Sequence, residues 1–434
     1  MNETLRPVGI VGGVRIPFCR SNTLYADLSN LDMLTAALNG LVDKYHLEGA
    51  HIDEVVGGAV VTHSKDWNLA REAVIGSKLA PSTPGITMMQ ACGTSLQAAM
   101  GIAAKIASGQ IECGIAMGAD TTSDAPIVFS KRFATRVTQW AQQKTAWDKV
   151  KVLKRFSLAE LAPRPPSVNE PRTGLSMGEH CELMAREWHV SRREQDELAY
   201  ASHKKAAEAY KSGYMDDLIV PCAGVLRDNN IREDISLDRM ATLKTVFDRS
   251  DRGTLTAANS TPLTDGAATA LLASEAWAAK RRLPILAYLT HCQTVANNFV
   301  AGDGLLMAPT VAVGKMLDRA GLRLQDFDFY EIHEAFAAQV VATLKAWESG
   351  EYCKRFLDRD EALGPIDRAK LNVKGSSIAF GHPFAATGAR IMANLAKLLS
   401  EHGGHGLISV CTAGGMGVAA ILESARAGEM KMAA

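Results

Sequence analysis

Two cysteines and two histidines occupy sequence contexts that suit covalent chemistry. Cys92 stands in the stretch QACGTS, where a glycine turn leads into an apolar run with helical spacing that continues to residue 109. The free N–H groups and the dipole at a helix start favour a thiolate over a thiol. Cys92 is therefore a candidate nucleophile. Taken alone, the segment also fits an unreactive buried cysteine, so the other candidates decide the interpretation.

The other three residues lie in the second half of the chain. His333 lies at the end of a predicted buried strand, in EIHEAF, and His382 sits between a glycine and a proline that restrict the backbone on both sides of it. Cys411 ends a strand and enters the glycine turn of SVCTAGGMG, whose free N–H groups suit an oxyanion. Each of these residues also has a purely structural interpretation.

Together, these groups match the needs of carbon–carbon bond cleavage beside a thioester. One sulfur attacks a carbonyl carbon and holds the acyl group, while a histidine activates that sulfur. A second acid/base then handles the proton on the α-carbon. This chemistry requires the two halves of the chain to face each other.

The elements that position these residues alternate between strands and helices, which predicts an α/β fold with parallel, doubly covered sheets. In the first half we expect strands at 8–14, 52–61 and 113–119, and helices at 31–44 and after Cys92. The order returns late in the chain, with helices at 310–320 and from 381, and strands at 324–336 and 406–415. We therefore predict two similar domains, packed face to face, whose strand ends and helix starts build the site.

The predicted domain limits follow from this repeat. The N-terminal domain covers 1–280 and contains a charged, helix-rich excursion at 124–250, which is interpreted as a lid or cofactor platform. The C-terminal domain covers 281–434 and is interrupted near 345–371. A chain of 434 residues is expected to form two or three domains.

Composition excludes several other classes of protein. The 47 basic and 47 acidic residues balance, which gives no reason to expect a nucleic-acid partner. No apolar run approaches the ~18 residues of a membrane span, and no signal peptide is expected at the N-terminus. The 8 cysteines contain no CxxC pair, which argues against a zinc site or a disulfide framework and favours a cytoplasmic location.

The segment 131–156 differs from the rest of the chain. It is strongly basic, with Asp148 as its single acid, and its large apolar residues recur near helical spacing. A basic amphipathic helix with tryptophan suits an anionic membrane surface or an acidic partner. The alternative is an ordinary helix that packs against another subunit.

The motifs in this order resemble those of the thiolases. The resemblance rests on CGTS from 92, HEAF from 333, GHPxxATG from 381 and CTAGGMG from 411, and on four supporting stretches: RIPF from 15, MGE from 177, SRREQDxLAxxSHxKA from 191 and GTLTAANSTPLTDGAA from 253. It runs nearly from end to end and is most similar to the thiolase subunit of trifunctional β-oxidation complexes. Most thiolases carry asparagine where this chain has His333, and glycine where it has Ala413.

This resemblance implies a fold and a set of roles. The fold would be two βαβαβαββ domains in five layers, αβαβα, with a large inserted loop domain. The activity would be that of a 3-ketoacyl-CoA thiolase, with Cys92 as the acyl-accepting nucleophile, His382 as its activator and Cys411 as the acid/base at the α-carbon. The N–H groups of Cys92 and Ala413 would form one oxyanion hole. His382 and His333 would form the other, in which His333 either holds a water molecule or donates directly.

The resemblance also places coenzyme A, as a substrate, across the excursion. Arg232 would face the nucleotide, and Ser260 and Thr261 would face the pantetheine arm. The apolar walls would be Met177, Phe247 and Phe336. The alternatives are solvated surface for Arg232, turn capping for the two hydroxyls and ordinary core for the apolar residues. No metal or redox cofactor is implied.

The implied partners are CoA thioesters, a second copy of the chain in a homodimer core, and an enoyl-CoA hydratase/3-hydroxyacyl-CoA dehydrogenase subunit. Segment 131–156 would contact that subunit or lipid. Three rival functions stay open: a biosynthetic thiolase that forms acetoacetyl-CoA, a decarboxylating condensing enzyme like the ketoacyl synthases, and an acyl-binding scaffold subunit. Cys411 discriminates against the condensing enzyme, since decarboxylation needs no acid/base at the α-carbon.

Overall fold

The strands of the protein form a mixed sheet that runs through both halves of the chain. The structure is a computed structural model that describes residues 5–154, 157–163 and 169–426. Within these residues ten strands pair in the order β4-β3-β5-β6-β1-β7-β10-β9-β8, and β2 pairs with β6. The strands are β1 Gly9–Arg15, β2 Cys19–Arg20, β3 Glu54–Gly58, β4 Gly85–Thr87, β5 Cys113–Asp120, β6 Thr264–Ala273, β7 Ala287–Ala296, β8 Phe329–Ile332, β9 His405–Thr412 and β10 Met416–Ser424.

The strand order repeats itself as a mirror image about the middle of the sheet. The set β3-β5-β6-β1 on one side corresponds to β8-β9-β10-β7 on the other, and β1 joins β7 through the antiparallel pairs Gly9–Tyr288 and Ile10–Ala287. In each set the first two strands are parallel and the rest are antiparallel. The repeat confirms the predicted duplication, while the domain boundary near residue 280 stays a prediction.

The expectation of parallel sheets is wrong, and chain connectivity explains why. Only three residues separate β9 from β10, and so short a turn can join only antiparallel strands. The predicted strand at 324–336 is also too long. It contributes only Phe329–Ile332 to the sheet, so His333 stands directly after a strand end rather than inside a strand.

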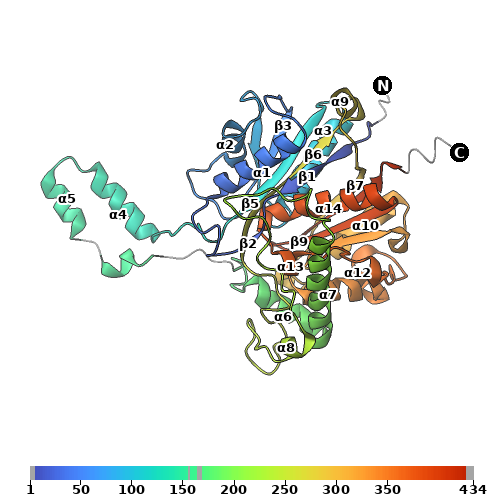
Figure 1. Cartoon of the computed structure of the whole chain (residues 1–434). Helices are drawn as coiled ribbons and strands as arrows, with labels where there is room; N and C mark the ends of the chain where they lie inside the picture. Colours follow the sequence, from blue (N-terminus) through green and yellow to red (C-terminus); the bar gives the residue numbers. More distant parts are fainter. Residues whose placement is uncertain (1–4, 155–156, 164–168, 427–434) are drawn as a thin grey trace.

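The helices cover the sheet and fill the space between its halves (Figure 1). Helix α3 packs against α14 and β5, and α14 also packs against β1, which makes these two helices the shared central layer. On the outer faces, α1 contacts β6 and α10 contacts β10. The helices outside the excursion are α1 Asn30–Lys44, α2 Leu69–Ile75, α3 Thr94–Ala107, α9 Glu275–Arg281, α10 Ala308–Ala320, α11 Ala337–Glu348, α12 Gly350–Leu357, α13 Ser377–Phe380 and α14 Thr387–His402.

Small side chains allow the two central helices to approach closely. A Cβ added to Gly388 of α14 would lie 2.4 Å from the backbone nitrogen of Leu96 in α3. The main core lies around these helices and includes Ala99, Ile102 and Ile391, all fully buried. Because α3 begins beside Cys92 and α14 begins just after His382, this packing brings the two halves of the site together.

The excursion folds mostly against the second half of the chain. Its helices are α4 Lys131–Gln142, α5 Ala146–Leu153, α6 Met177–Glu187, α7 Arg192–Lys211 and α8 Leu237–Ala241. Helices α6 and α7 pack on α11, whereas α4 and α5 extend away from the body of the molecule (Figure 1). A buried ion pair ties the excursion to the sheet, since both guanidinium nitrogens of Arg15 lie 2.6 Å from the carboxylate oxygens of Asp228. In the described part of the chain, no helix combines the length and apolar character that crossing a bilayer requires.

Candidate active site

Cys92 lies just before the start of α3, in a strained turn. Gly93 is the N-cap residue, and the preceding Ala91 adopts φ +45°, a left-handed conformation that costs a non-glycine residue roughly 1–2 kcal/mol. A Cβ on Gly93 would meet the side chains of Thr412 and Val418 at 2.9 Å. The turn therefore holds the nucleophile candidate against the end of β9, and Cys92 keeps 8% of its surface exposed.

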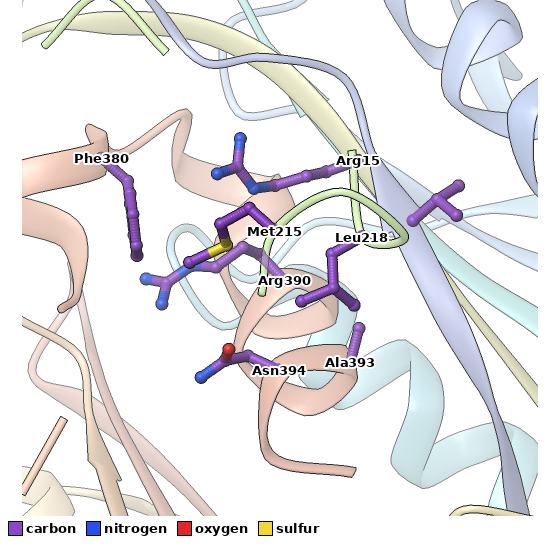
Figure 2. A pocket seen from close by; sticks show the side chains of 8 residues that line it. Arg15, Met215, Leu218, Phe380, Arg390, Ala393 and Asn394 are labelled. Carbon is purple, nitrogen blue, oxygen red and sulfur yellow. The ribbon is translucent and has the colours of Figure 1, made fainter. Parts of the chain in front are cut away.

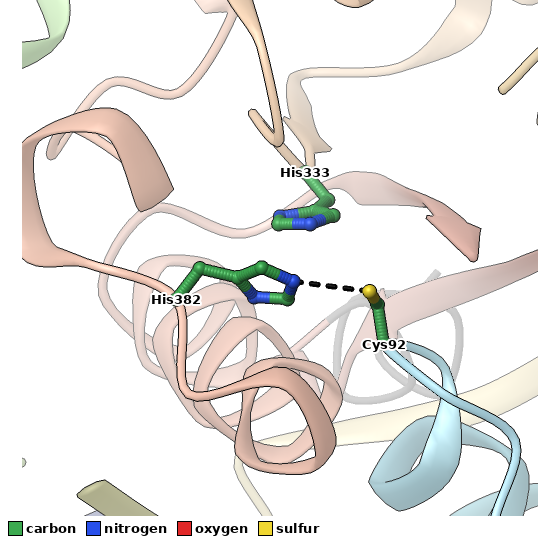
Figure 3. A group of neighbouring side chains, drawn as sticks. All are labelled: Cys92, His333 and His382. Atoms are coloured by element: carbon green, nitrogen blue, oxygen red, sulfur yellow. Dashed lines mark hydrogen bonds between the residues drawn. The ribbon is translucent and has the colours of Figure 1, made fainter. Parts of the chain in front are cut away.

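His382 contacts the Cys92 sulfur from the opposite half of the molecule. Its Nε2 lies 3.0 Å from Sγ (Figure 3). Its Nδ1 lies 2.6 Å from the hydroxyl oxygen of Thr387. Gly381 positions the ring with φ +102°, and a Cβ there would lie 2.6 Å from the hydroxyl of Thr264. When Nδ1–H donates to Thr387, Nε2 is left as an acceptor for the thiol proton.

The resting pair is a neutral thiol and a neutral imidazole. Burial raises the pKa of Cys92 to about 12, although the Ala413 and Cys92 backbone N–H groups act in the opposite direction. Burial, with the nearby charge of Arg390, lowers the pKa of His382 to about 3. The expectation of a thiolate at the helix start is therefore wrong for the resting state, because removal from water outweighs the helix terminus. A neutral thiol needs a nearby base if it is to attack a carbonyl carbon, and His382 Nε2 lies within hydrogen-bond distance of this one.

His333 completes a compact group with these two residues. Its ring centroid lies 4.1 Å from that of His382, and its Nδ1 lies 2.8 Å from the hydroxyl of Ser377. One ligand-type atom from each of Cys92, His333 and His382 lies within 4.8 Å of the others (Figure 3). Such a group has the donors to hold a soft divalent cation. The Cys92–His382 hydrogen bond accounts for their approach without one.

Cys411 lies next to this group, near the end of β9. It is buried, and its pKa is raised well above the usual value by burial, with the neighbouring Cys92 and Cys181 sulfurs acting in the same direction. The structure thus brings Cys92, His333 and His382 into one group and places Cys411, on β9, near the Cys92 sulfur. Their catalytic roles stay predictions.

The turn after Cys411 resolves how alanine can replace glycine at position 413. The left-handed angles of the turn fall on Gly414, at φ +78°, and Gly415, at φ +69°, and not on Ala413. Glu170 from the excursion accepts a hydrogen bond of 2.8 Å from the Gly414 N–H and so holds the turn. The Ala413 N–H remains directed at the Cys92 sulfur, whose pKa it lowers.

A pocket of about 420 Å³ lies between the excursion and two segments of the first half of the chain, 20–22 and 256–263, with Ile378 contributed by the second half. Four of the predicted coenzyme A residues line it: Arg232, Phe247, Ser260 and Thr261. Phe336 packs edge-on against Phe247, with ring centroids 5.7 Å apart. Met177 belongs to the same apolar cluster as Phe336 and Cys411. The buried Ser260 hydroxyl has no protein partner, whereas that of Thr261 donates to the Ser377 carbonyl. Contact of these six residues with coenzyme A stays a prediction.

Several residues of this region escaped the sequence-based reasoning. Arg20, His203 and Asn230 also line the pocket. Behind the site, the Ser377 hydroxyl forms a hydrogen bond with His333 Nδ1, and Arg390 donates a hydrogen bond to the same hydroxyl. One signal was available for Arg390, a charged residue on the apolar face of the helix after GHPFAATG. The others have no distinguishing pattern in the sequence.

Two family models match most of the chain. The family model described as "Thiolase, N-terminal domain" matches residues 8–276, and "Thiolase, C-terminal domain" matches residues 283–424. The chain belongs to the thiolase family. Together the two matches include all four of the motifs that carry the candidate catalytic residues.

Curated relatives and solved structures match over nearly the whole chain. The chain is 40% identical to the 3-ketoacyl-CoA thiolase of Alteromonas mediterranea, over 96% of this chain and 97% of that one. It is 41% identical to the enzyme of the same name from Photobacterium profundum, with the same coverage. Bacillus anthracis acetyl-CoA acetyltransferase superposes with a TM-score of 0.81 at 28% identity, covering 97% of this chain and 99% of that one. Human mitochondrial 3-ketoacyl-CoA thiolase superposes with a TM-score of 0.80 at 26% identity, covering 97% of this chain and 100% of that one.

Proposed function

We propose that this thiolase is a 3-ketoacyl-CoA thiolase, an acyltransferase that cleaves 3-ketoacyl-CoA with coenzyme A in fatty-acid β-oxidation. The observation that carries the proposal is the 3.0 Å contact between the Cys92 sulfur and His382 Nε2. Around it stand His333, Cys411 and the Ala413 N–H, which are the further groups that this reaction needs. The relatives named 3-ketoacyl-CoA thiolase support the same activity.

The first half of the proposed reaction forms an acyl-enzyme. The Cys92 sulfur attacks the keto carbon while its proton passes to His382 Nε2, and the Cys92 and Ala413 N–H groups stabilise the oxyanion. Collapse of this adduct breaks the bond between C2 and C3. The acyl group stays on sulfur, and the departing enolate of acetyl-CoA takes a proton from Cys411.

The second half returns the site to its resting state. The thiol of an incoming coenzyme A gives its proton to the Cys411 thiolate and attacks the acyl carbon. Cys92 leaves as a thiolate and regains its proton from His382. No metal or redox group takes part in either half of this proposal.

We propose that coenzyme A occupies the pocket of about 420 Å³. The Arg232 guanidinium would face its phosphates, and the unpartnered Ser260 hydroxyl would bind the pantetheine arm beside Thr261. Met177, Phe247 and Phe336 would form the apolar wall that leads towards Cys411.

Other assignments remain part of the proposal. A homodimer is supported by the outermost position of β4 in the sheet and by exposed apolar residues beside it, which are Trp67, Ile86 and Met89. A cytoplasmic location is supported by the 8 free cysteines, and the domain limits 1–280 and 281–434 by the mirrored sheet.

Segment 131–156 is proposed to contact a hydratase/dehydrogenase subunit or lipid. Its described part, α4 and α5, exposes Trp140 and Trp147 on helices that stand away from the body. Neutralising Lys149, Lys151 and Lys154, together with Arg155 outside the described residues, should abolish pull-down of that subunit or vesicle binding. Unchanged binding to both would contradict this assignment.

The deciding experiment is a thiolysis assay with short, medium and long 3-ketoacyl-CoA substrates, with and without the partner subunit. We expect CoA-dependent release of acetyl-CoA from the wild-type protein and none from Cys92→Ser. Turnover of malonyl-CoA in place of cleavage would favour a decarboxylating condensing enzyme. Failure of any acyl donor to label Cys92 would favour a scaffold subunit.

A further inference from the structure

The surroundings of His333 are more specific than burial of an imidazole requires. The ring is fully buried, with Nδ1 2.8 Å from the Ser377 hydroxyl. Its other nitrogen, Nε2, has no protein partner although it is inaccessible to solvent. Buried polar atoms without a partner are uncommon and call for an explanation. Here the unpartnered nitrogen belongs to a ring whose centroid lies 4.1 Å from that of the His382 imidazole, with the two planes tilted by 48°, in the reaction centre.

Arg390 restricts what the Ser377 hydroxyl can do. One guanidinium nitrogen of Arg390 donates to the Ser377 oxygen at 2.7 Å, and arginine can only donate. The hydroxyl therefore accepts from Arg390 and has one proton of its own to give. If it gives that proton to His333 Nδ1, both the Ser377 hydroxyl and the Nδ1 lone pair are satisfied. If instead Nδ1–H donated to the hydroxyl, the Ser377 proton would face no acceptor that the structure shows.

The arginine itself is held firmly in place. It lies on α14 beside a small cavity of about 10 Å³, with its guanidinium carbon 5.8 Å from the Phe380 ring centroid (Figure 2). A weaker contact of 3.4 Å reaches the neighbouring Ser376 hydroxyl, and Glu331 lies at 3.9 Å. Burial lowers the pKa of Arg390 to about 10, so the side chain still carries its charge at neutral pH.

We propose that Ser377, held by Arg390, is a positioning residue that keeps His333 as the neutral Nε2–H tautomer and so makes it a direct hydrogen-bond donor in the reaction centre. The proposal rests on the proposed function, in which the thioester oxygen of the acetyl-CoA enolate needs such a donor. The positive charge of Arg390 also disfavours a second proton on the His333 ring. Burial first, then His382 and Arg390, lower the pKa of His333 well below its usual value and keep the ring neutral.

The tautomer can be observed directly in the wild-type protein by nitrogen NMR after labelling histidine with ¹⁵N. We expect His333, assigned by the signals that His333→Asn removes, to show an unprotonated Nδ1 and a protonated Nε2. A protonated Nδ1 would overturn the proposal. This measurement needs neither turnover nor a Ser377 variant that folds, so its outcome is independent of the proposed activity.

Kinetics test the consequence. Removal of one oxyanion-hole donor typically lowers kcat by about 10²–10³-fold, so loosening that donor in Ser377→Ala should lower kcat for thiolysis about 10-fold or more. KM for coenzyme A should stay within about 2-fold. Exchange of the acetyl-CoA α-protons with deuterium oxide should fall in parallel, since it passes through the same enolate. Acylation of Cys92, whose oxyanion faces the Ala413 N–H, should change by less than about 3-fold.

Two variants control for general damage to the fold. Ser377→Thr keeps the hydroxyl and should recover most of the lost kcat. Ser376→Ala removes the adjacent hydroxyl, which contacts Arg390 but not His333, and should leave kcat within about 3-fold of wild type. A Ser377→Ala enzyme with unchanged kcat and proton exchange would refute the positioning role. A wild-type protein that never acylates Cys92 would instead refute the proposed function.

Discussion

Replacing His382 with asparagine isolates the proton transfer on which the site depends. Burial raises the pKa of Cys92 to about 12, so at pH 7 about one thiol in 10⁵ is ionised. At about 1.36 kcal/mol per pKa unit, ionising the thiol at pH 7 costs about 7 kcal/mol. In the proposed mechanism, His382 overcomes this cost by accepting the proton across the 3.0 Å contact during attack. Without this base, the variant depends on the rare thiolate.

The pH dependence follows from the same two pKa values. With His382 lowered to about 3 and Cys92 raised to about 12, neither group changes its protonation between about pH 5 and pH 9. The acylation rate constant of the wild type should therefore be level across this range. In His382→Asn it should fall about 10³-fold at pH 7 and rise about tenfold per pH unit as the thiolate fraction grows.

Rapid-quench mass spectrometry of the acyl-enzyme formed from 3-ketoacyl-CoA measures both quantities. Melting curves of the two proteins at each pH control for unfolding. A variant that acylates within tenfold of the wild-type rate at pH 7, or that shows a level pH profile, would refute the assignment of His382 as the base.

Three further predictions concern Cys411, the turn after it and the ion pair that anchors the excursion. Cys411→Ala should still form the acyl-enzyme but should not exchange the α-protons of acetyl-CoA with deuterium oxide; normal exchange would rule out its acid/base role. Ala413→Gly should keep kcat within about 2-fold of wild type. Gly415→Ala should lower Tm, because a side chain at φ +69° is strained and its Cβ would lie 2.6 Å from a carbon of the Phe299 ring. Equal melting curves for Gly415→Ala and wild type would contradict the account of this turn. Arg15→Met should cost about 3–5 kcal/mol in urea unfolding, because the buried Asp228 loses its positively charged partner. A loss under about 1 kcal/mol would show that the ion pair does not anchor the excursion.

The reactive residues could be found from the sequence because they combine unusual chemistry with unusual backbone. Cys92 and His382 each stand beside a glycine in a turn, Cys411 lies near the end of a strand that leads into a glycine turn, and His333 follows a buried strand. The duplication was equally accessible, because the alternation of helices and strands recurs in the same order. Both signals are local, so a single sequence contains them.

What could not be predicted depends on contacts between distant segments. The protonation state of Cys92 is set by burial under the second half of the chain, which outweighs the helix start that the sequence shows. Ser377 and Arg390 acquire a role only because α13 and α14 bring them behind His333. The mixed sheet was missed because periodicity identifies strands but not their directions.

The most direct test of the central claim is to locate the acyl group after the protein meets a 3-ketoacyl-CoA in the absence of free coenzyme A. Peptide mass spectrometry should find the shortened acyl group on Cys92 alone, and addition of coenzyme A should remove it as acyl-CoA. An acyl group on another cysteine, or undiminished thiolysis by Cys92→Ala, would contradict the account.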